Sequence, residues 1–479
     1  MQTIQKLFAP RDLTQGSPMS GIALFSIPLL LGNLAQQLYN TVDAIVVGRY
    51  VGDAALGAVG LAGPVLNLMI VLFMGISTGA TIVVSQYFGA KDREALSRAV
   101  GTTVMLTLWS GILMSVIGML CARPLLLLLG TPEEMLDMAS DYLFIIMLGI
   151  TGMAFYAILS GVLRGLSVSP LIYLLIASLL NIVLDIAFIT LLGMTTDGVA
   201  WATIIAQGVS AVLCFLRLRR MRDTLDLNRH TLRLDKPIMN RIVRLGVPAG
   251  MTQMIFSLSS ILVQSLTNSL GPNVVTAVTA VMRVDGFAMM PNFTFGVAAT
   301  TFTGQNVGAR RMDRVHQGAK ATLVLAVATS TVLTACILIF GESLMRVFTQ
   351  TNEIVMMGIG MFQMLAVGYI AFGVTQTLQG VMRGAGETVI PMWISIIVTV
   401  VIRMPIAYLW AYLTRTPAMP AGDPMCLYGS LLISWLLGCA MSIWVYLRGK
   451  WKRKCLWDDT DAEMRAAFSE ADQQNEGSL

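Results

Sequence analysis

The first long apolar run of the sequence, residues 20–52, is long enough to cross a bilayer but carries many polar side chains. These side chains are Asn33, Gln36, Gln37, Asn40, Thr41 and Asp43. At about 100° per residue they share one face of a helix, and apolar side chains cover the rest. A charged side chain at the bilayer centre costs about 2.5–3.5 kcal/mol on insertion scales, so Asp43 is expected to have a function. The polar face must therefore lie against a cavity or another helix.

Pro28 lies inside the same run. Because proline has no N–H, it removes one backbone hydrogen bond and gives the helix a place to bend. We interpret this first helix as the moving, ion-sensing element of the protein, hinged at Pro28.

A second polar pair lies in NIVLDIAFI, where Asn181 and Asp185 are four residues apart and share a helix face. Together with Asp43 and a hydroxyl such as that of Thr203, they could form a cluster of oxygen atoms inside the first six helices. Hard oxygen ligands suit a monovalent cation such as Na⁺, whereas two carboxylates in a poorly solvated site can instead share or take up a proton. A structural hydrogen-bond network is the other interpretation of the same residues.

The C-terminal half has ions of its own, Arg283, Asp285 and Arg403, in MRVDGFAMMPNF and VIRMPIAYLW. The simpler interpretation is a charge-neutralising pair of Asp285 with one of the arginines, because unpaired charge in a membrane is costly. A second ion site or a contact with substrate is the alternative.

The composition indicates a polytopic membrane protein made of helices. The chain has 479 residues, of which 56% are hydrophobic and 12% charged, against about 25% charged in soluble domains. It contains no GxxxxGK[ST] phosphate loop, no HExxH motif and no zinc-type cysteine spacing. An ATP-driven pump and an intramembrane enzyme are therefore disfavoured, and so is a channel, because charge rings and filter-like repeated loops are absent from the sequence.

Twelve apolar segments have about the length that a membrane span needs. They lie near residues 20–47, 55–83, 99–120, 139–163, 168–192, 199–216, 244–268, 274–302, 319–340, 353–380, 389–413 and 427–447. Lysine and arginine are concentrated at the two termini and in every second connection, whereas the other connections contain only Arg49, Arg123, Arg346 and Arg415. The positive-inside rule then predicts twelve helices with both termini in the cytoplasm.

The two halves of the sequence are copies. A shift of 219 residues places Gln86 on Gln305, and GVLRG at 161–165 on GVMRG at 380–384. Six helices in each half enter the membrane in the same orientation, as parallel repeats that enclose a central cleft. The same shift places Asp43 near Val263 and Asp185 on Met404, so the carboxylate pair is confined to the first half.

These observations predict an order of domains along the chain. An N-terminal six-helix lobe (1–216) is followed by a basic cytoplasmic linker (217–243), a C-terminal six-helix lobe (244–447) and a polar cytoplasmic tail (448–479). The basic linker indicates positive-inside topology and attraction to anionic lipid, and not nucleic-acid binding.

The chain resembles the multidrug and toxic compound extrusion (MATE) family over essentially its whole length. The resemblance rests on NTVDAIVVGRYVG, on the paired SQYFGAK and GQNVGAR, on GVLRG with GVMRG, and on NIVLD. It implies two six-helix bundles around a V-shaped cleft, and export of amphipathic, often cationic, molecules in exchange for H⁺ or Na⁺. In the DinF-like branch the resemblance places the cation site on Asp43, Asn181 and Asp185, with Thr203 a weaker match. The NorM-like branch has a glutamate in helix seven, where this sequence has MTQMIFSLSS without an acid.

We therefore expect a monomeric antiporter of the inner membrane that works by alternating access. Its partners would be small organic substrates and the lipid bilayer, and H⁺ or Na⁺ would be the coupling ion in place of any other cofactor. A flippase for a lipid-linked precursor is the alternative, since a large cleft also suits lipids; it would need cationic cavity walls, for which Arg283 and Arg403 are the candidates.

Overall fold

The computed structural model describes residues 11–46, 51, 53–128, 131–228, 230–417 and 419–454, and within them the chain is helical, without a named strand. The first half contains α2 (Pro18–Val46), α3 (Asp53–Gly89), α4 (Arg93–Leu128), α5 (Glu133–Gly165), α6 (Leu171–Thr190) and α7 (Thr196–Arg220). The second half contains α8 (Lys236–Ser269), α9 (Pro272–Gly308), α10 (Met312–Arg346), α11 (Asn352–Gly384), α12 (Val389–Ile396), a π-helical segment (Ile397–Arg403), α13 (Met404–Leu413) and α14 (Met425–Leu447).

The twelve predicted spans are confirmed, because twelve helices of the described part are long and apolar enough to cross a membrane. Many large apolar side chains on their outer surfaces are exposed, among them Leu120, Leu128 and Ile339. In water such a surface would be unfavourable, whereas lipid tails cover it at no cost. The chain is a multi-pass membrane protein.

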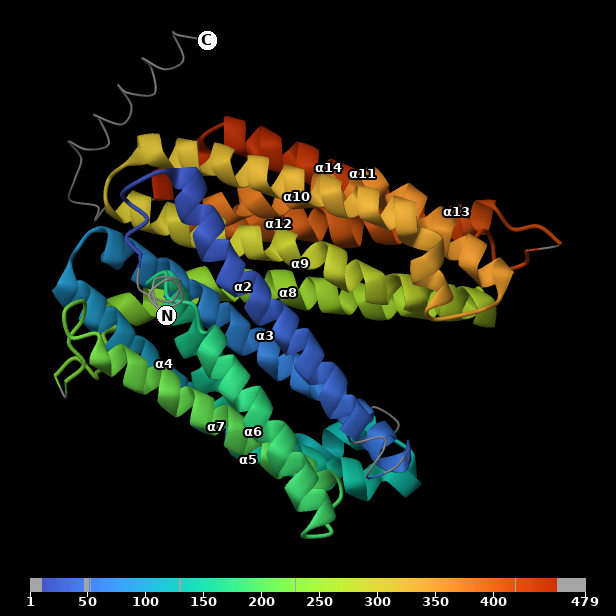
Figure 1. Cartoon of the computed structure of the whole chain (residues 1–479), viewed down its shortest axis with the longest axis horizontal. Coiled ribbons are helices and arrows are strands. Elements are labelled where there is room, and N and C mark those ends of the chain that lie inside the picture. Colours follow the sequence, from blue (N-terminus) through green and yellow to red (C-terminus); the bar gives the residue numbers. More distant parts are fainter. Residues whose placement is uncertain are drawn as a thin grey trace, which may run out of the picture.

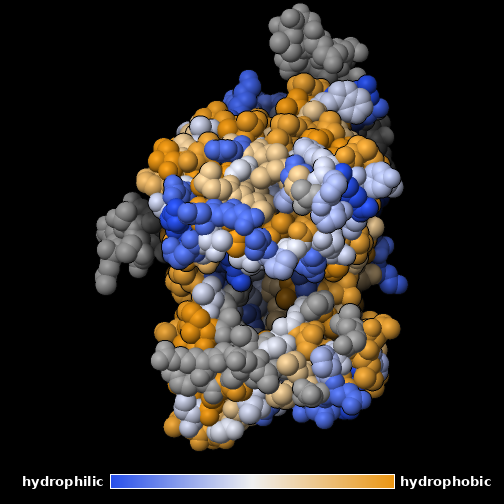
Figure 2. Space-filling view, turned by 90° about the vertical axis from the view of Figure 1, so that its right-hand side faces the viewer, coloured by the Kyte–Doolittle hydropathy of each residue, from blue (hydrophilic) through white to orange (hydrophobic). Residues whose placement is uncertain are grey.

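The helices form two groups that meet at one end of the molecule and separate toward the other. In Figure 1 the first half (blue to green) and the second half (yellow-green to red) lie together on the left and diverge toward the right. We call these the joined end and the splayed end. Figure 2 faces the splayed end and shows a hollow between the two groups, with hydrophilic and neutral surface in its depth.

The internal repeat is confirmed in the backbone at the joined end. Helices α3 and α9 are each followed by a residue with positive φ, Lys91 (57°) and Arg310 (60°). Helices α5 and α11 end in the same way, at Ser167 (57°) and Gly386 (94°). Each pair is separated by the 219 residues of the sequence repeat, so both halves use the same turns to reverse the chain.

The first helix of each half packs against both halves. Helix α2 contacts α6 of its own half and also α9 and α10. Its side chains Ile22, Phe25 and Leu29 are buried in a cluster with Phe302 of α9. By the same arrangement, α8 packs against α3 and α4 of the first half and against α12 of its own. We predicted the lobe boundaries from the order of the helices along the chain. In space, α2 and α8 each contact helices of both halves.

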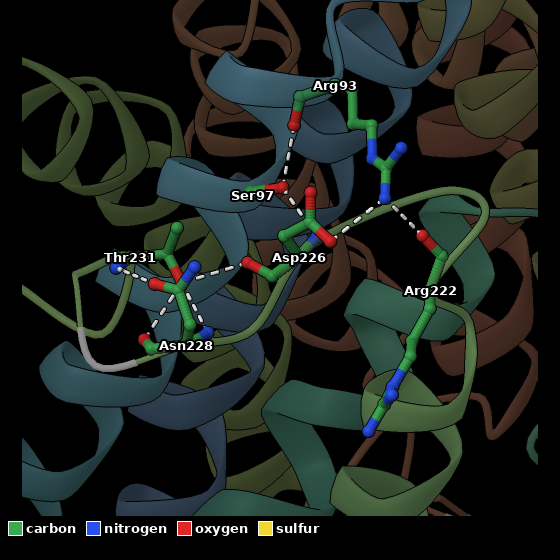
Figure 3. A network of polar contacts seen from close by, with 6 residues as sticks. All are labelled: Arg93, Ser97, Arg222, Asp226, Asn228 and Thr231. Carbon is green, nitrogen blue, oxygen red and sulfur yellow. Dashed lines mark hydrogen bonds and ion pairs between the residues drawn. The ribbon is translucent and has the colours of Figure 1, made fainter.

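The connection between the two halves is folded onto α4. Arg93 forms an ion pair with Asp226, with 2.9 Å between Nη2 and Oδ1, and donates a hydrogen bond to the carbonyl of Arg222 (Figure 3). The backbone N–H of Asp226 donates to Oγ of Ser97 at 2.8 Å. Leu225 is almost fully buried. Helix α7 continues to Arg220 and α8 begins at Lys236, so the connection consists of residues 221–235. It is shorter than the basic linker predicted at 217–243.

Candidate functional site

Helix α6 presents one buried stripe, which contains the predicted polar pair. The stripe consists of Leu171, Leu174, Ala177, Asn181 and Asp185, spaced three or four residues apart. This spacing keeps all five side chains on one face of the helix, which packs against α7 and α2. The other face of α6 is apolar and exposed, as expected next to lipid.

The structure brings Asn181, Asp185 and Thr203 together. Asn181 and Asp185 are fully buried. Thr203 lies on α7, with its Oγ1 3.5 Å from the end of the Asn181 amide. The Asn181 amide satisfies both neighbours when its nitrogen faces Asp185: Nδ2 then donates to the Asp185 Oδ2 at 2.9 Å, and the amide oxygen accepts from the Thr203 backbone N–H at 3.3 Å. Asn181 thus joins the carboxylate of α6 to α7.

The predicted polar face of α2 is described only in part. The backbone of α2 continues to Val46, but the side chains of Asn40 and Asp43 lie outside the described residues. Gln36 is half-buried and Gln37 is exposed. Because α2 packs against α6, its polar face and the Asn181–Asp185 pair lie on neighbouring helices.

Asn33 of α2 contacts the other half of the protein, which the sequence did not indicate. Its Nδ2 donates to Oγ1 of Thr294 on α9 at 3.0 Å. Pro28, which is buried, lies inside α2 between Phe25 and Leu29, two residues that pack against α9 and α10. A bend at Pro28 would therefore change the contact of α2 with the second half. The Thr294 partner is 261 residues away from Asn33, and no local pattern predicts such a distant contact.

The predicted ion pair of Asp285 is not formed among the described residues. Asp285 is buried on α9 and accepts a hydrogen bond from the hydroxyl of Tyr369 on α11. None of the five ion pairs in the described part includes Asp285. Arg283 is two residues away on the same helix, where side chains do not face each other, and it is exposed. Tyr369 thus provides the donor that we had expected from an arginine.

Arg403 lies at the end of the π-helical segment Ile397–Arg403. Its Nη1 is 3.4 Å from Oγ of Ser259 on α8. Pro405 follows at the start of α13 and has no N–H to donate to the carbonyl four residues before it, which accounts for the local change of helix type. Tyr428 of α14 is buried in the neighbourhood of both Asp285 and Arg403, and we refer to these three residues as the second polar cluster.

The two polar clusters differ in their chemistry. The first offers carboxylate, amide and hydroxyl oxygen atoms, a donor set that fits a monovalent cation or a proton. In the second, the Asp285 carboxylate already accepts a hydrogen bond from Tyr369, and Arg403 adds positive charge nearby. The first cluster is therefore the candidate cation site.

Comparisons with known proteins agree with this architecture. A family model described as MatE matches residues 28–187 and 248–409, one stretch in each half. The chain is 29% identical over 465 residues to the probable multidrug resistance protein YoeA of Bacillus subtilis (strain 168), which covers 95% of this chain and 98% of the relative. It is 23% identical over 359 residues to the DNA damage-inducible protein F of Escherichia coli (strain K12), covering 74% and 76%. A crystal structure described as MATE in the straight conformation superposes with a TM-score of 0.84 at 24% identity, covering 92% of this chain and 98% of the other.

Proposed function

The chain belongs to the MatE family of transporters, and from this premise we propose that it is a secondary active exporter that exchanges amphipathic, often cationic, organic molecules for H⁺ or Na⁺. Membership of this family makes it a transporter and not an enzyme. The relative from Bacillus subtilis is described as a probable multidrug resistance protein, which supports a broad range of small organic substrates here.

The observation that carries the proposal is the position of a fully buried carboxylate, Asp185, beside Asn181 and Thr203. Keeping an ionised group in a membrane interior is costly, so such a group is retained for a function. A bound Na⁺ would neutralise the Asp185 carboxylate by coordination, and a proton would neutralise it by forming the neutral acid. Either ion removes the cost of the buried charge.

The proposed site exists in one half only. The positions that correspond to Asn181 and Asp185 under the 219-residue shift are Val400 and Met404, which offer no side-chain oxygen. The shift does not extend to Thr203, because α14 begins only at Met425. The fold is repeated but this donor set is not, so we place ion coupling in the first half. We include Asp43 in the site because α2, which carries it, packs against α6.

Helix α2 gives the site a route to the second half. It contacts α6, which carries Asp185, and it contacts α9 through the Asn33–Thr294 hydrogen bond. Ion binding can drive alternating access only if the two conformations differ in affinity for the ion, and each tenfold difference corresponds to about 1.4 kcal/mol. We propose that α2, hinged at Pro28, is the element whose packing differs between them.

We place the protein in the inner membrane as a monomer, with the joined end and both termini in the cytoplasm. The turns at the joined end carry basic residues such as Lys91, Arg93 and Arg310, and the α7–α8 connection adds more. The described connections at the splayed end contribute few, among them Arg415. The positive-inside rule favours this orientation.

The proposal is tested with purified protein in proteoliposomes, by measuring transport of a fluorescent organic cation under a proton gradient or a sodium gradient imposed separately. Asp185→Asn keeps the size and hydrogen-bonding capacity of the side chain but fixes it neutral. We expect folded protein that no longer responds to the gradient, and the same for Asp43→Asn. The double variant should be little worse than either single one if both acids belong to one site.

Asp141→Asn is the matched control, because Asp141 lies on α5 of the same half but is exposed. It should transport like the parent. Full gradient-driven transport by Asp185→Asn would refute the proposed coupling site, whatever the control does.

A further inference from the structure

Two glutamines that are equivalent in the repeat make the same contact across the joined end, in opposite directions. Gln86 of α3 donates from Nε2 to the carbonyl of Gly384, the last residue of α11, at 2.9 Å. Gln305 of α9 donates from Nε2 to the carbonyl of Gly165, the last residue of α5, at 3.0 Å. Both the donors and the acceptors are separated by 219 residues. Each half therefore binds a helix end of the other half.

The two carbonyls need such a partner. The last carbonyls of a helix have no acceptor role inside the helix, and a buried one must be paired elsewhere. The turns at Ser167 and Gly386, both with positive φ, end α5 and α11 at this point. Gln86 and Gln305 are themselves fully buried, so no water replaces them in this conformation.

Both ends of each amide are used. The Gln86 Oε1 accepts from Nη2 of Arg241, on α8, at 3.2 Å. The Gln305 Oε1 accepts from the backbone N–H of Leu13, in the segment before α2, at 3.1 Å. Gln305 also donates to Oγ of Ser167 at 2.8 Å. Gln86 thus joins α3 to the end of α11 and to α8. Gln305 joins α9 to the end of α5 and to the segment before α2.

The backbones of α3 and α9 approach closely at the same place. A Cβ atom added to Gly89 would lie 2.6 Å from the Cα of Gln305, and one added to Gly308 would lie 2.7 Å from the carbonyl carbon of Gln86. Glycine is therefore required at both positions for the glutamines to reach across. The same contact thus occurs twice, once from each half, as the internal repeat requires.

We infer that Gln86 and Gln305 are the paired gate of the joined end: they hold it closed while the splayed end is open, and both of their contacts must break before the joined end can open. This inference rests on alternating access, which belongs to the proposed function, but it does not depend on the ion site. Losing one buried hydrogen bond of this kind shifts an equilibrium by about tenfold. Because one opening movement breaks both bonds, the two losses should multiply.

The test is a distance measurement by electron spin resonance on a full-length, cysteine-free variant in lipid nanodiscs. Spin labels at Glu94 and Asp313, exposed and equivalent in the repeat, report across the joined end. Labels at Glu133 and Glu353, which are exposed at the starts of α5 and α11, report across the splayed end. Gln86→Met and Gln305→Met keep the length of the side chain but remove its donor.

We expect each methionine variant to raise about tenfold the ratio of long to short distances at the joined end, and to shorten the distances at the splayed end. The double variant should show the larger shift. The control is Gln264→Met: Gln264 is exposed on α8 and donates to Asn268 of the same helix, so neither distance should change. An unchanged joined end in the variants would overturn the inference, and so would a widening of both ends, which indicates loss of packing.

Ser167→Gly provides an independent variant that leaves both glutamines in place. It removes one acceptor of Gln305, and glycine tolerates the positive φ of this position, as Gly386 does in the other half. If Ser167→Gly shifts the joined end toward the open state, the lost hydrogen bond is the cause. If neither Ser167→Gly nor the methionine variants shift it, the two glutamines are not a gate. These distances are measured without an ion gradient, so their outcome is separate from that of Asp185→Asn.

Discussion

Substituting Gly75 by alanine tests the close crossing of α3 and α8, which belong to different halves. Gly75 of α3 faces Gly246 and Gly250 of α8, and a Cβ at this position would lie 2.8 Å from the Gly246 carbonyl oxygen and 3.0 Å from the Gly250 Cα. Carbon atoms in contact normally lie about 3.5–4.0 Å apart, so the helices would have to separate by about 0.5–1 Å. All the atoms involved are backbone and cannot turn aside. Overpacking of this kind costs about 1–3 kcal/mol.

A matched substitution on the same helix gives the opposite sign. Gly60 is exposed on α3, and an added Cβ would meet nothing within 4 Å. Alanine in a helix interior is favoured over glycine by about 0.5–1 kcal/mol, so Gly60→Ala should stabilise the protein by that amount. Gly75→Ala has the same gain but adds the overpacking cost of about 1–3 kcal/mol, which leaves a net loss of up to about 2.5 kcal/mol.

The measurement is the free energy of unfolding of the purified protein by titration with sodium dodecyl sulfate, followed by circular dichroism. The two variants should differ by about 2 kcal/mol. Equal midpoints for Gly75→Ala and Gly60→Ala would show that α3 and α8 do not approach as closely as described, and the reasoning from small residues at this crossing would fail.

Three further predictions concern other parts of the molecule. Pro28→Ala restores a backbone hydrogen bond within α2, so it should insert normally yet transport several-fold more slowly in proteoliposomes; unchanged turnover would remove the hinge. Tyr369→Phe leaves the buried Asp285 without its donor and should lower the free energy of unfolding by about 1–3 kcal/mol, whereas Asp285→Asn keeps an acceptor and should cost less; the reverse order would contradict the described pairing. Tags at the N-terminus, in the 221–235 connection and at the C-terminus should all report from the cytoplasm, and labelling of any one from outside the cell would contradict the proposed orientation.

The membrane spans, the repeat and the polar pair of α6 were predictable from the sequence, because each depends on local spacing. A continuous hydrophobic run of about 20 residues is helical in lipid, since a single helix satisfies all of its backbone groups within the segment. Asn181 and Asp185 are four residues apart, and any helix places them on one face. The 219-residue shift predicted two similar halves, and the positive φ angles at the equivalent residues Lys91 and Arg310 agree with it.

The tertiary partners were not predictable in the same way. The sequence presented Asp285 with arginines at positions 283 and 403, but the hydroxyl that binds it belongs to Tyr369, 84 residues away. Opposite charge does not by itself identify the partner of a buried carboxylate, because a tyrosine hydroxyl can satisfy the carboxylate in place of an arginine. Helix packing decides which donor is within reach. The contact of α2 with the second half was missed for the same reason: Asn33 and Thr294 carry no charge and share no motif.

The contacts that close the joined end are repeated in both halves, whereas the proposed ion site at Asp185 occurs in the first half alone. The gate contacts of Gln86 and Gln305 occur once in each direction, so neither half alone determines whether the joined end is open. Asp185, by contrast, corresponds to Met404 in the other half. An ion bound in the first half can therefore move the symmetric gate only through an element that contacts both halves. Helix α2 meets this requirement, because the segment before it donates to Gln305 through Leu13 and its middle donates to α9 through Asn33. A change in the packing of α2 near Asp185 would thus act directly on the Gln305 contact. Because the Gln86 and Gln305 contacts break in one movement, weakening one of them favours opening of the whole joined end.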